Sequence, residues 1–125
     1  MLESENSRSP WSQATSYRQA IIQPVDKPIQ ASLRVPGSKS YTNRALIISA
    51  LAKGRSTLTG ILKSDDSYWC IEALKQLGLA IEVEEDRVRI DGQSGHWPRQ
   101  EARLFLGAAG TLARFLPGAL AAGQG

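Results

Sequence analysis

Three side chains that bind anions well stand close together in the stretch 36–44. Lys39 carries a point charge, Ser40 has a hydroxyl group, and Arg44 has a planar guanidinium that can donate to two oxygens at once. Arg44 follows Ser40 by four residues, which places both on one face of a helix. Since a helix N-terminus also attracts anions through its free N–H groups, this stretch predicts a site for a phosphate or carboxylate group.

Two alternatives for this stretch have to be weighed. In the simpler one, a serine only caps the helix while Lys39 and Arg44 face water. The other is a nucleotide-binding P-loop, which requires glycine directly before the lysine and a second glycine five residues earlier. Ser38 occupies the first of these positions, and Ser32 or Leu33 the second, so the P-loop is excluded. The anion site is the better interpretation, and the simple cap stays open.

A second glycine-rich turn occupies 107–110 and precedes another predicted helix. Small residues allow a ligand to approach the backbone closely, Thr111 stands where a helix cap belongs, and Arg114 follows shortly inside the helix. Such turns are common, and the alternative is a tight turn without a ligand. Two helix starts that are each followed by an arginine favour a second binding site.

The order of strands and helices predicts an α/β fold. Alternating or β-branched residues predict strands, and helical spacing ended by Gly54 and Gly78 predicts the first two helices. The expected elements are a strand at 31–35, a helix at 41–53, a strand at 55–61, a helix after 64–67 that runs to 77, a hairpin of 79–84 with 87–91, a strand at 104–106 and a helix at 111–122. This order gives one complete βαβαββ unit at about 31–91 and the start of a second at about 104–122. An unfinished second unit suggests a fragment of a longer chain.

Composition places the chain among ordinary globular proteins. It has 125 residues, of which 42% are hydrophobic and 22% charged, and its mean hydropathy is -0.25. It lacks the apolar run of roughly 20 residues that spans a membrane, and acids near the N-terminus argue against a signal peptide, so we expect a cytoplasmic protein. Residues 1–20 are polar and rich in serine, which predicts a disordered or loosely attached leader.

Charge is divided unevenly along the chain. From Lys27 to Lys63 there are seven basic residues and no acid, whereas 64–86 holds seven acids and one base. The net charge is +3. The alternative is chance clustering of solvated charges, but the basic stretch contains Lys39 and Arg44, which fits an anionic ligand.

At these residues the sequence resembles the enolpyruvyl-shikimate-phosphate (EPSP) synthases, the 3-phosphoshikimate 1-carboxyvinyltransferases. The resemblance covers about 21–125. It rests on three motifs in the order of that family, namely Val35-Pro36-Gly37-Ser38-Lys39-Ser40 with Asn43-Arg44, then Ser64-Asp65-Asp66, then Leu104-Phe105-Leu106-Gly107 with Ala109-Gly110-Thr111 and Arg114. The resemblance implies two domains, each of three βαβαββ units, with substrates in the cleft between them. The chain then corresponds to the N-terminal part of a longer enzyme.

The resemblance also implies an activity and roles for four residues. The family transfers the enolpyruvyl group of phosphoenolpyruvate to the 5-hydroxyl of shikimate 3-phosphate and releases phosphate, in the pathway to chorismate and aromatic amino acids. Lys39 matches the lysine that contacts both substrates, Ser40 and Arg44 match residues that hold shikimate 3-phosphate, and Gly110 matches a glycine at the phosphoenolpyruvate site. No metal or organic cofactor takes part. The expected partners are these two small molecules, with no nucleic acid or membrane and a monomeric parent chain. The acid and base groups are expected beyond Gly125, so no catalytic residue is assigned here and the chain alone is expected to be inactive.

Three departures from the family pattern leave details open. Ala108 stands where the family usually has asparagine, Phe115 where it often has proline or leucine, and the leader is longer than is usual in bacterial members. The related transferase that acts on a UDP-amino sugar usually has asparagine after the lysine, and Ser40 disfavours it. A non-catalytic fragment that binds anions or nucleic acid is the alternative from another class; interleaved aromatic residues, which nucleic-acid binding would favour, are missing from the basic stretch.

The remaining reactive side chains have simpler interpretations. Cys70 is expected to be a buried thiol without a chemical role, and a single cysteine forms no internal disulfide. His96 lies in a turn-like stretch without a partner nearby in sequence. Asp65 and Asp66 are expected to serve the cap and dipole of a helix start, and the acids of 82–86 to be the solvated face and turn of a hairpin.

Overall fold

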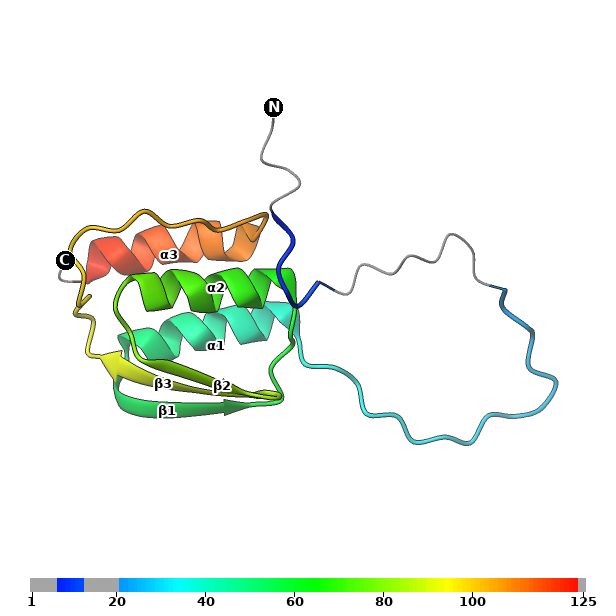
Figure 1. Cartoon of the computed structure of the whole chain (residues 1–125). Helices are drawn as coiled ribbons and strands as arrows, with labels where there is room; N and C mark the ends of the chain where they lie inside the picture. The colour runs from blue at the N-terminus through cyan, green and yellow to red at the C-terminus, as the bar shows by residue number, and fades with distance from the viewer. Residues whose placement is uncertain (1–6, 13–20, 124–125) are drawn as a thin grey trace, which may run out of the picture.

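The structure is a computed structural model, and it describes residues 7–12 and 21–123. The helices are α1 (Lys39–Leu51), α2 (Asp65–Gln76) and α3 (Gly110–Ala122), and the strands are β1 (Lys53–Thr59), β2 (Ile81–Glu84) and β3 (Arg87–Gln93). The strands form one antiparallel sheet in the order β1-β3-β2. The three helices run side by side over one face of this sheet, with α3 farthest from it (Figure 1). The α/β class, with mixed helix and sheet, is confirmed.

Local sequence signals account for the first two helices. The Ser38 side chain accepts a hydrogen bond from the backbone N–H of Tyr41 at the start of α1, at 3.4 Å. At the start of α2, Ser64 and Ser67 each accept a bond from the other's backbone N–H, which is a reciprocal capping box. Gly78 follows α2 with a φ of +96°, a conformation that glycine adopts without a steric penalty. These helices lie within two or three residues of their predicted ends.

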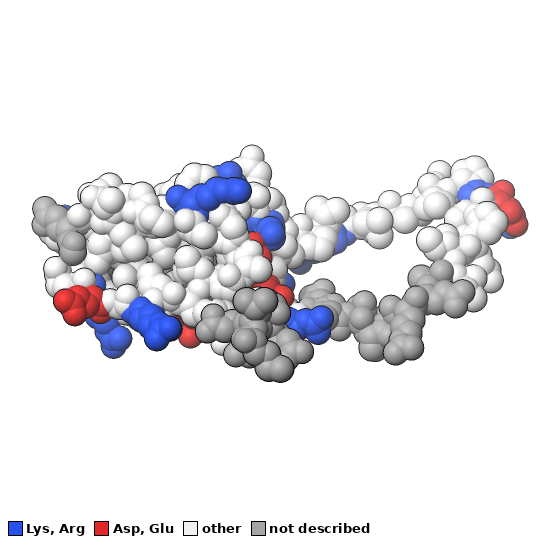
Figure 2. All heavy atoms as spheres, turned by 90° about the horizontal axis from the view of Figure 1, so that it is seen from above, with Lys and Arg blue, Asp and Glu red and all other residues white. Residues whose placement is uncertain are grey.

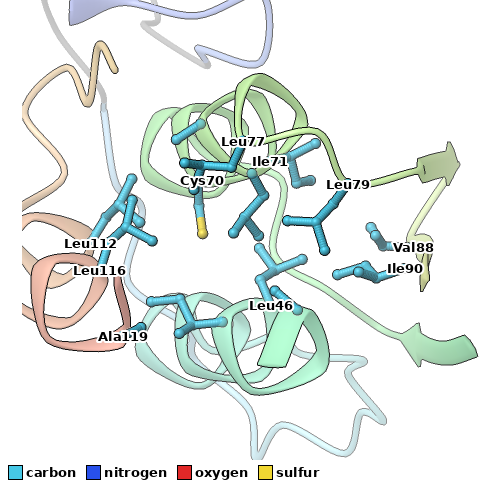
Figure 3. Packing of buried hydrophobic residues seen from close by; sticks show 14 of the residues in the cluster. Leu46, Cys70, Ile71, Leu77, Leu79, Val88, Ile90, Leu112, Leu116 and Ala119 are labelled. Carbon is cyan, nitrogen blue, oxygen red and sulfur yellow. The ribbon is translucent and has the colours of Figure 1, made fainter. Parts of the chain in front are cut away.

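A continuous apolar core joins the sheet to all three helices (Figure 3). Leu46 of α1 and Leu74 of α2 are fully buried and belong to the same apolar cluster as Ile90 from the middle strand β3. Leu112 and Leu116 of α3 pack against the other side of α1 and α2. The predicted hairpin of β2 and β3 is confirmed, and its alternation places Val88 and Ile90 in the core.

Two predicted strands are wrong. The stretch 31–35 is extended but exposed, with Leu33 84% and Val35 79% accessible, and it pairs with no described strand. Alternation favours an extended backbone, but a strand also requires a neighbouring backbone to pair with. The stretch 104–106 is likewise unpaired; it packs through Leu104 and Leu106, and the Leu106 carbonyl accepts from the Ala109 N–H. The described part of the predicted βαβαββ unit therefore lacks its first strand.

The leader prediction also differs from the structure where it is described. Residues 7–12 lie against the start of α2 through hydrogen bonds from Ser9 and to Ser7. A short polar segment docks in this way when it offers donors to a carboxylate and aromatic surface to other rings. The remaining positions of the predicted leader, 1–6 and 13–20, lie outside the described residues.

Backbone packing at Gly37 yields a stability prediction. A Cβ atom at this position would overlap the carbonyl oxygen of Gly60 and lie 2.9 Å from the Leu62 nitrogen. We expect Gly37→Ala to lower the free energy of unfolding by about 1–3 kcal/mol, because the overlapping atoms belong to backbone and cannot rotate away. Urea unfolding of the 125-residue chain measures this. Gly118→Ala is the control, since nothing lies within 4 Å of its added Cβ. Equal stability of Gly37→Ala and the unsubstituted chain would contradict the prediction.

Candidate functional site

The N-terminal ends of all three helices lie at one end of the molecule, where the extended segment 21–38 leaves the body (Figure 1). Each helix N-terminus carries the equivalent of a partial positive charge. Asp65 and Asp66 supply acid to the first turn of α2, whereas the first turns of α1 and α3 contain none. Basic and acidic side chains lie next to one another at this end (Figure 2). The arrangement favours anions at the starts of α1 and α3.

Lys39 is the first residue of α1, and its ammonium is paired. Its Nζ lies 3.0 Å from Oδ2 of Asp66, and the Lys39 side chain is 52% exposed against 15% for Asp66. The ion pair joins the start of α1 to the start of α2. Asp66 therefore does more than the cap and dipole role expected of it, because it fixes the position of the lysine predicted to bind anions.

Arg44 is held by two contacts one turn into α1. Its Nη1 donates to the backbone oxygen of Ser40 at 3.1 Å, and its guanidinium lies 5.0 Å above the centre of the Phe115 ring from α3. Both Ser40 and Arg44 are exposed. The predicted shared face of these two residues is therefore accessible to solvent. Phe115 stacks on the arginine, a contact that sequence spacing alone did not indicate.

Two residues between Ser40 and Arg44, namely Thr42 and Asn43, were given no individual role by the sequence analysis. The Thr42 hydroxyl accepts a hydrogen bond of 3.0 Å from the backbone N–H of Leu62, which ties α1 to the connection between β1 and α2. Asn43 is fully buried, and within the described part of the chain neither atom of its amide group has a hydrogen-bond partner. The signal was present in the sequence, since both are polar residues on the helix face that Leu46 and Ile47 continue into the core.

The second predicted helix start has a different local structure from the first. Ala109, not Thr111, holds the N-cap position, so no side chain caps α3 and the expected role of Thr111 is wrong. Gly110 is the first helical residue. Gly107 has a φ of +54°, and a Cβ there would lie 2.5 Å from Cδ1 of Trp69. The turn thus rests against an aromatic ring, and the start of α3 leaves backbone N–H groups without a side-chain acceptor.

The remaining candidates keep their simpler interpretations. Cys70 is buried, and burial raises the pKa of its thiol to about 12, so it is uncharged at neutral pH. His96 is exposed. The described residues contain no group of histidine, cysteine, aspartate and glutamate side chains able to hold a metal ion. None of the described helices has the length and apolar character to cross a bilayer.

Comparison with known proteins identifies one family. The model of the family described as EPSP synthase (3-phosphoshikimate 1-carboxyvinyltransferase) matches residues 24–125. The 3-phosphoshikimate 1-carboxyvinyltransferase 2 of Halalkalibacterium halodurans is 54% identical over 117 residues, which is 94% of this chain and 26% of that protein. The 3-phosphoshikimate 1-carboxyvinyltransferase of Pseudomonas syringae pv. tomato is 47% identical over 104 residues, 83% of this chain and 25% of that protein.

A solved structure shares the fold. EPSP synthase from Acinetobacter baumannii superposes with a TM-score of 0.67 at 32% identity, over 73% of this chain and 21% of that one. The chain spans about a quarter of the length of the curated relatives it matches.

The Thr42 contact yields a second stability prediction. Thr42→Val keeps the size of the side chain but leaves the Leu62 N–H without its acceptor, so we expect a loss of about 1–3 kcal/mol in the free energy of unfolding. Thr42→Ser is the matched control, because it keeps the hydroxyl and loses one methyl group, at a cost of about 1 kcal/mol or less. Urea titrations of the three chains compare them. The reverse order of stability would show that packing of the methyl group, not the hydrogen bond, matters here.

Proposed function

The chain belongs to the EPSP synthase family, and on that premise we propose that it forms the N-terminal part of an enzyme that transfers the enolpyruvyl group of phosphoenolpyruvate to the 5-hydroxyl of shikimate 3-phosphate. Phosphate is the second product. The observation that carries the proposal is the placement of Lys39, Ser40 and Arg44 at the start of α1, at the end of the molecule where all three helices begin. Both substrates are multiply charged anions, and this is the end that favours them.

Ser40 and Arg44 form the part of the site proposed for shikimate 3-phosphate. A guanidinium that donates to two phosphate oxygens requires a defined plane. The bond from Arg44 to the Ser40 carbonyl and the Phe115 ring beneath it restrict that plane before a ligand arrives. Restricting the side chain in advance lowers the entropy lost on binding. Phe115, a departure from the family pattern, supports this half of the site as a stacking surface.

Lys39 is proposed to contact both substrates, and Asp66 to hold it in place. An unpaired lysine at a helix start samples many positions, because its side chain has four rotatable bonds. The contact with Asp66 holds the ammonium beside the first turn of α2. A carboxylate beside the lysine also weakens its attraction for anions. The Asp66 carboxylate thus helps to position the Lys39 ammonium but lowers the affinity of that ammonium for anionic substrates.

The half of the site proposed for phosphoenolpyruvate is the start of α3 at Gly110. It offers backbone N–H groups without a capping side chain, and Ala108 leaves this turn without the amide side chain usual in the family. This half therefore relies on backbone donors and on Lys39. The groups that move protons are proposed to belong to the rest of the enzyme, so the 125-residue chain alone should release no phosphate; each absent group costs roughly 10²–10⁴-fold in rate.

Phosphate release by the full-length enzyme, given both substrates, tests the proposed function. We expect Lys39→Ala to lower kcat/KM at least about 100-fold. The ammonium of Lys39 is proposed to contact both substrates, and its positive charge stabilises the negative charge that develops in the transition state. Lys53→Ala is the matched control, since Lys53 is exposed at the start of β1, after the opposite end of α1. Near-normal kinetics in Lys39→Ala would refute the assignment. If the enzyme turned over a UDP-amino sugar but not shikimate 3-phosphate, the proposed substrate would be wrong.

In the same assay, Asp66→Asn separates the effect of Asp66 on the position of the Lys39 ammonium from its effect on substrate affinity. We expect kcat to fall about 10- to 100-fold, because the ammonium loses its fixed position, while the KM for shikimate 3-phosphate stays the same or decreases. Asp86→Asn makes the same change in net charge at an exposed position of the hairpin and should alter neither constant. A raised KM with unchanged kcat in Asp66→Asn would show that Asp66 does not position Lys39.

A further inference from the structure

Residues 7–12, which we call the N-terminal clamp, lie against the first turns of α2 (Figure 1). The backbone N–H and the hydroxyl of Ser9 both donate to Oδ1 of Asp65, the former at 2.8 Å. Nε1 of Trp69 donates to the backbone oxygen of Ser7 at 2.7 Å. Ser9 is 8% exposed. These hydrogen bonds join segments more than fifty positions apart in the sequence.

A row of aromatic rings extends the contact of the clamp. Trp11 meets Tyr68 with ring centres 5.4 Å apart, Tyr68 meets Trp69 at 5.1 Å, and Trp69 meets Phe105 at 4.8 Å. All three pairs are edge-to-face, which is a favourable geometry for aromatic rings. The ammonium of Lys63 lies 5.3 Å from the centre of the Trp11 ring, over its face. The clamp is thereby connected through α2 to the stretch just before α3.

Trp69 carries the connection to the start of α3. Its indole touches Gly107 so closely that a Cβ atom there would lie 2.5 Å from Cδ1 and 2.6 Å from Nε1. The same Nε1 donates to the clamp. The pyrrole part of the indole therefore both bonds to residue 7 and lies against the turn 107–110. This turn lacks a capping side chain of its own, so its position depends on what it rests against.

We propose that the N-terminal clamp positions the turn 107–110 through Trp69 and so sets the affinity of the site for phosphoenolpyruvate. This inference rests on the proposed function, which places that substrate at Gly110. The clamp acts on this substrate site through Asp65 and Trp69, so its residues are positioning residues. Hydrogen bonds from Ser9 also hold the pKa of Asp65 below its usual range, which agrees with a carboxylate that the clamp keeps charged. The family model begins at residue 24, so the clamp lies outside the region it matches.

Hydrogen exchange of the 125-residue chain tests the clamp without any substrate. Trp11→Ala removes one end of the aromatic row, and Ile22→Ala is the control, an apolar truncation at a side chain that is 88% exposed. We expect amide exchange in 107–111 to become about three- to tenfold faster in Trp11→Ala, with unchanged rates in β3 and in Ile22→Ala. Unchanged exchange in 107–111, or faster exchange everywhere, would overturn the proposal.

Steady-state kinetics of the full-length enzyme provide the second readout. Ser9→Ala removes the hydroxyl bond to Asp65, and we expect the KM for phosphoenolpyruvate to rise about three- to tenfold with the KM for shikimate 3-phosphate unchanged. Ser9→Thr keeps the hydroxyl and should restore the normal value. If Ser9→Ala only destabilised the fold, it would lower the fraction of active enzyme and change neither KM value. That result would overturn the proposal. If the unsubstituted enzyme shows no turnover, the proposed function fails, and the exchange experiment alone decides whether the clamp positions the turn.

Discussion

The fold depends on one feature: the three helices run parallel, so their N-termini, which carry partial positive charge, lie at the same end of the molecule (Figure 1). Parallel helix dipoles repel one another at their ends, and the repulsion has to be offset by negative charge. Asp65 and Asp66 supply that charge, and both sit on α2. One is fixed by the N-terminal clamp and the other by Lys39. The first turns of α1 and α3 contain no acid, so the anionic substrates proposed above would supply the negative charge there.

Each half of the proposed site is therefore built differently. At α1 the site consists of side chains, and each is restrained by a neighbour: Lys39 by Asp66, and Arg44 by Phe115 and a backbone carbonyl. At α3 the site consists of backbone, and the restraint is the close contact of Gly107 with Trp69. A side-chain site tolerates small shifts of its helix because long side chains adjust. A backbone site does not, since its donors move with the helix itself.

The sequence predicts elements whose signals are local and misses contacts that depend on packing. Helices α1 and α2 and the hairpin follow from serine caps, glycines and alternation within a few residues. The stretch 31–35 has the alternation of a strand, but a strand forms only by pairing with another, and none of the described strands pairs with it. Lys39, Ser40, Arg44 and Gly110 could be predicted as site residues because their motifs are contiguous in the sequence. Their supports Asp66, Phe115 and Trp69 belong to other helices, and the order of residues along the chain does not tell which helices touch.

Helix α3 shows why long-range supports matter most at the second half of the site. Its start lacks a side-chain cap, and Pro117 interrupts its backbone hydrogen bonding from within. Local propensity therefore specifies this helix weakly. Burial of Leu112 and Leu116 against α1 and α2 fixes the helix itself, but neither residue belongs to the turn 107–110. The turn is fixed instead by the Trp69 ring, whose indole nitrogen bonds to the N-terminal clamp. Residues 7–12 thus contact, through Trp69, the turn on which the proposed phosphoenolpyruvate site rests.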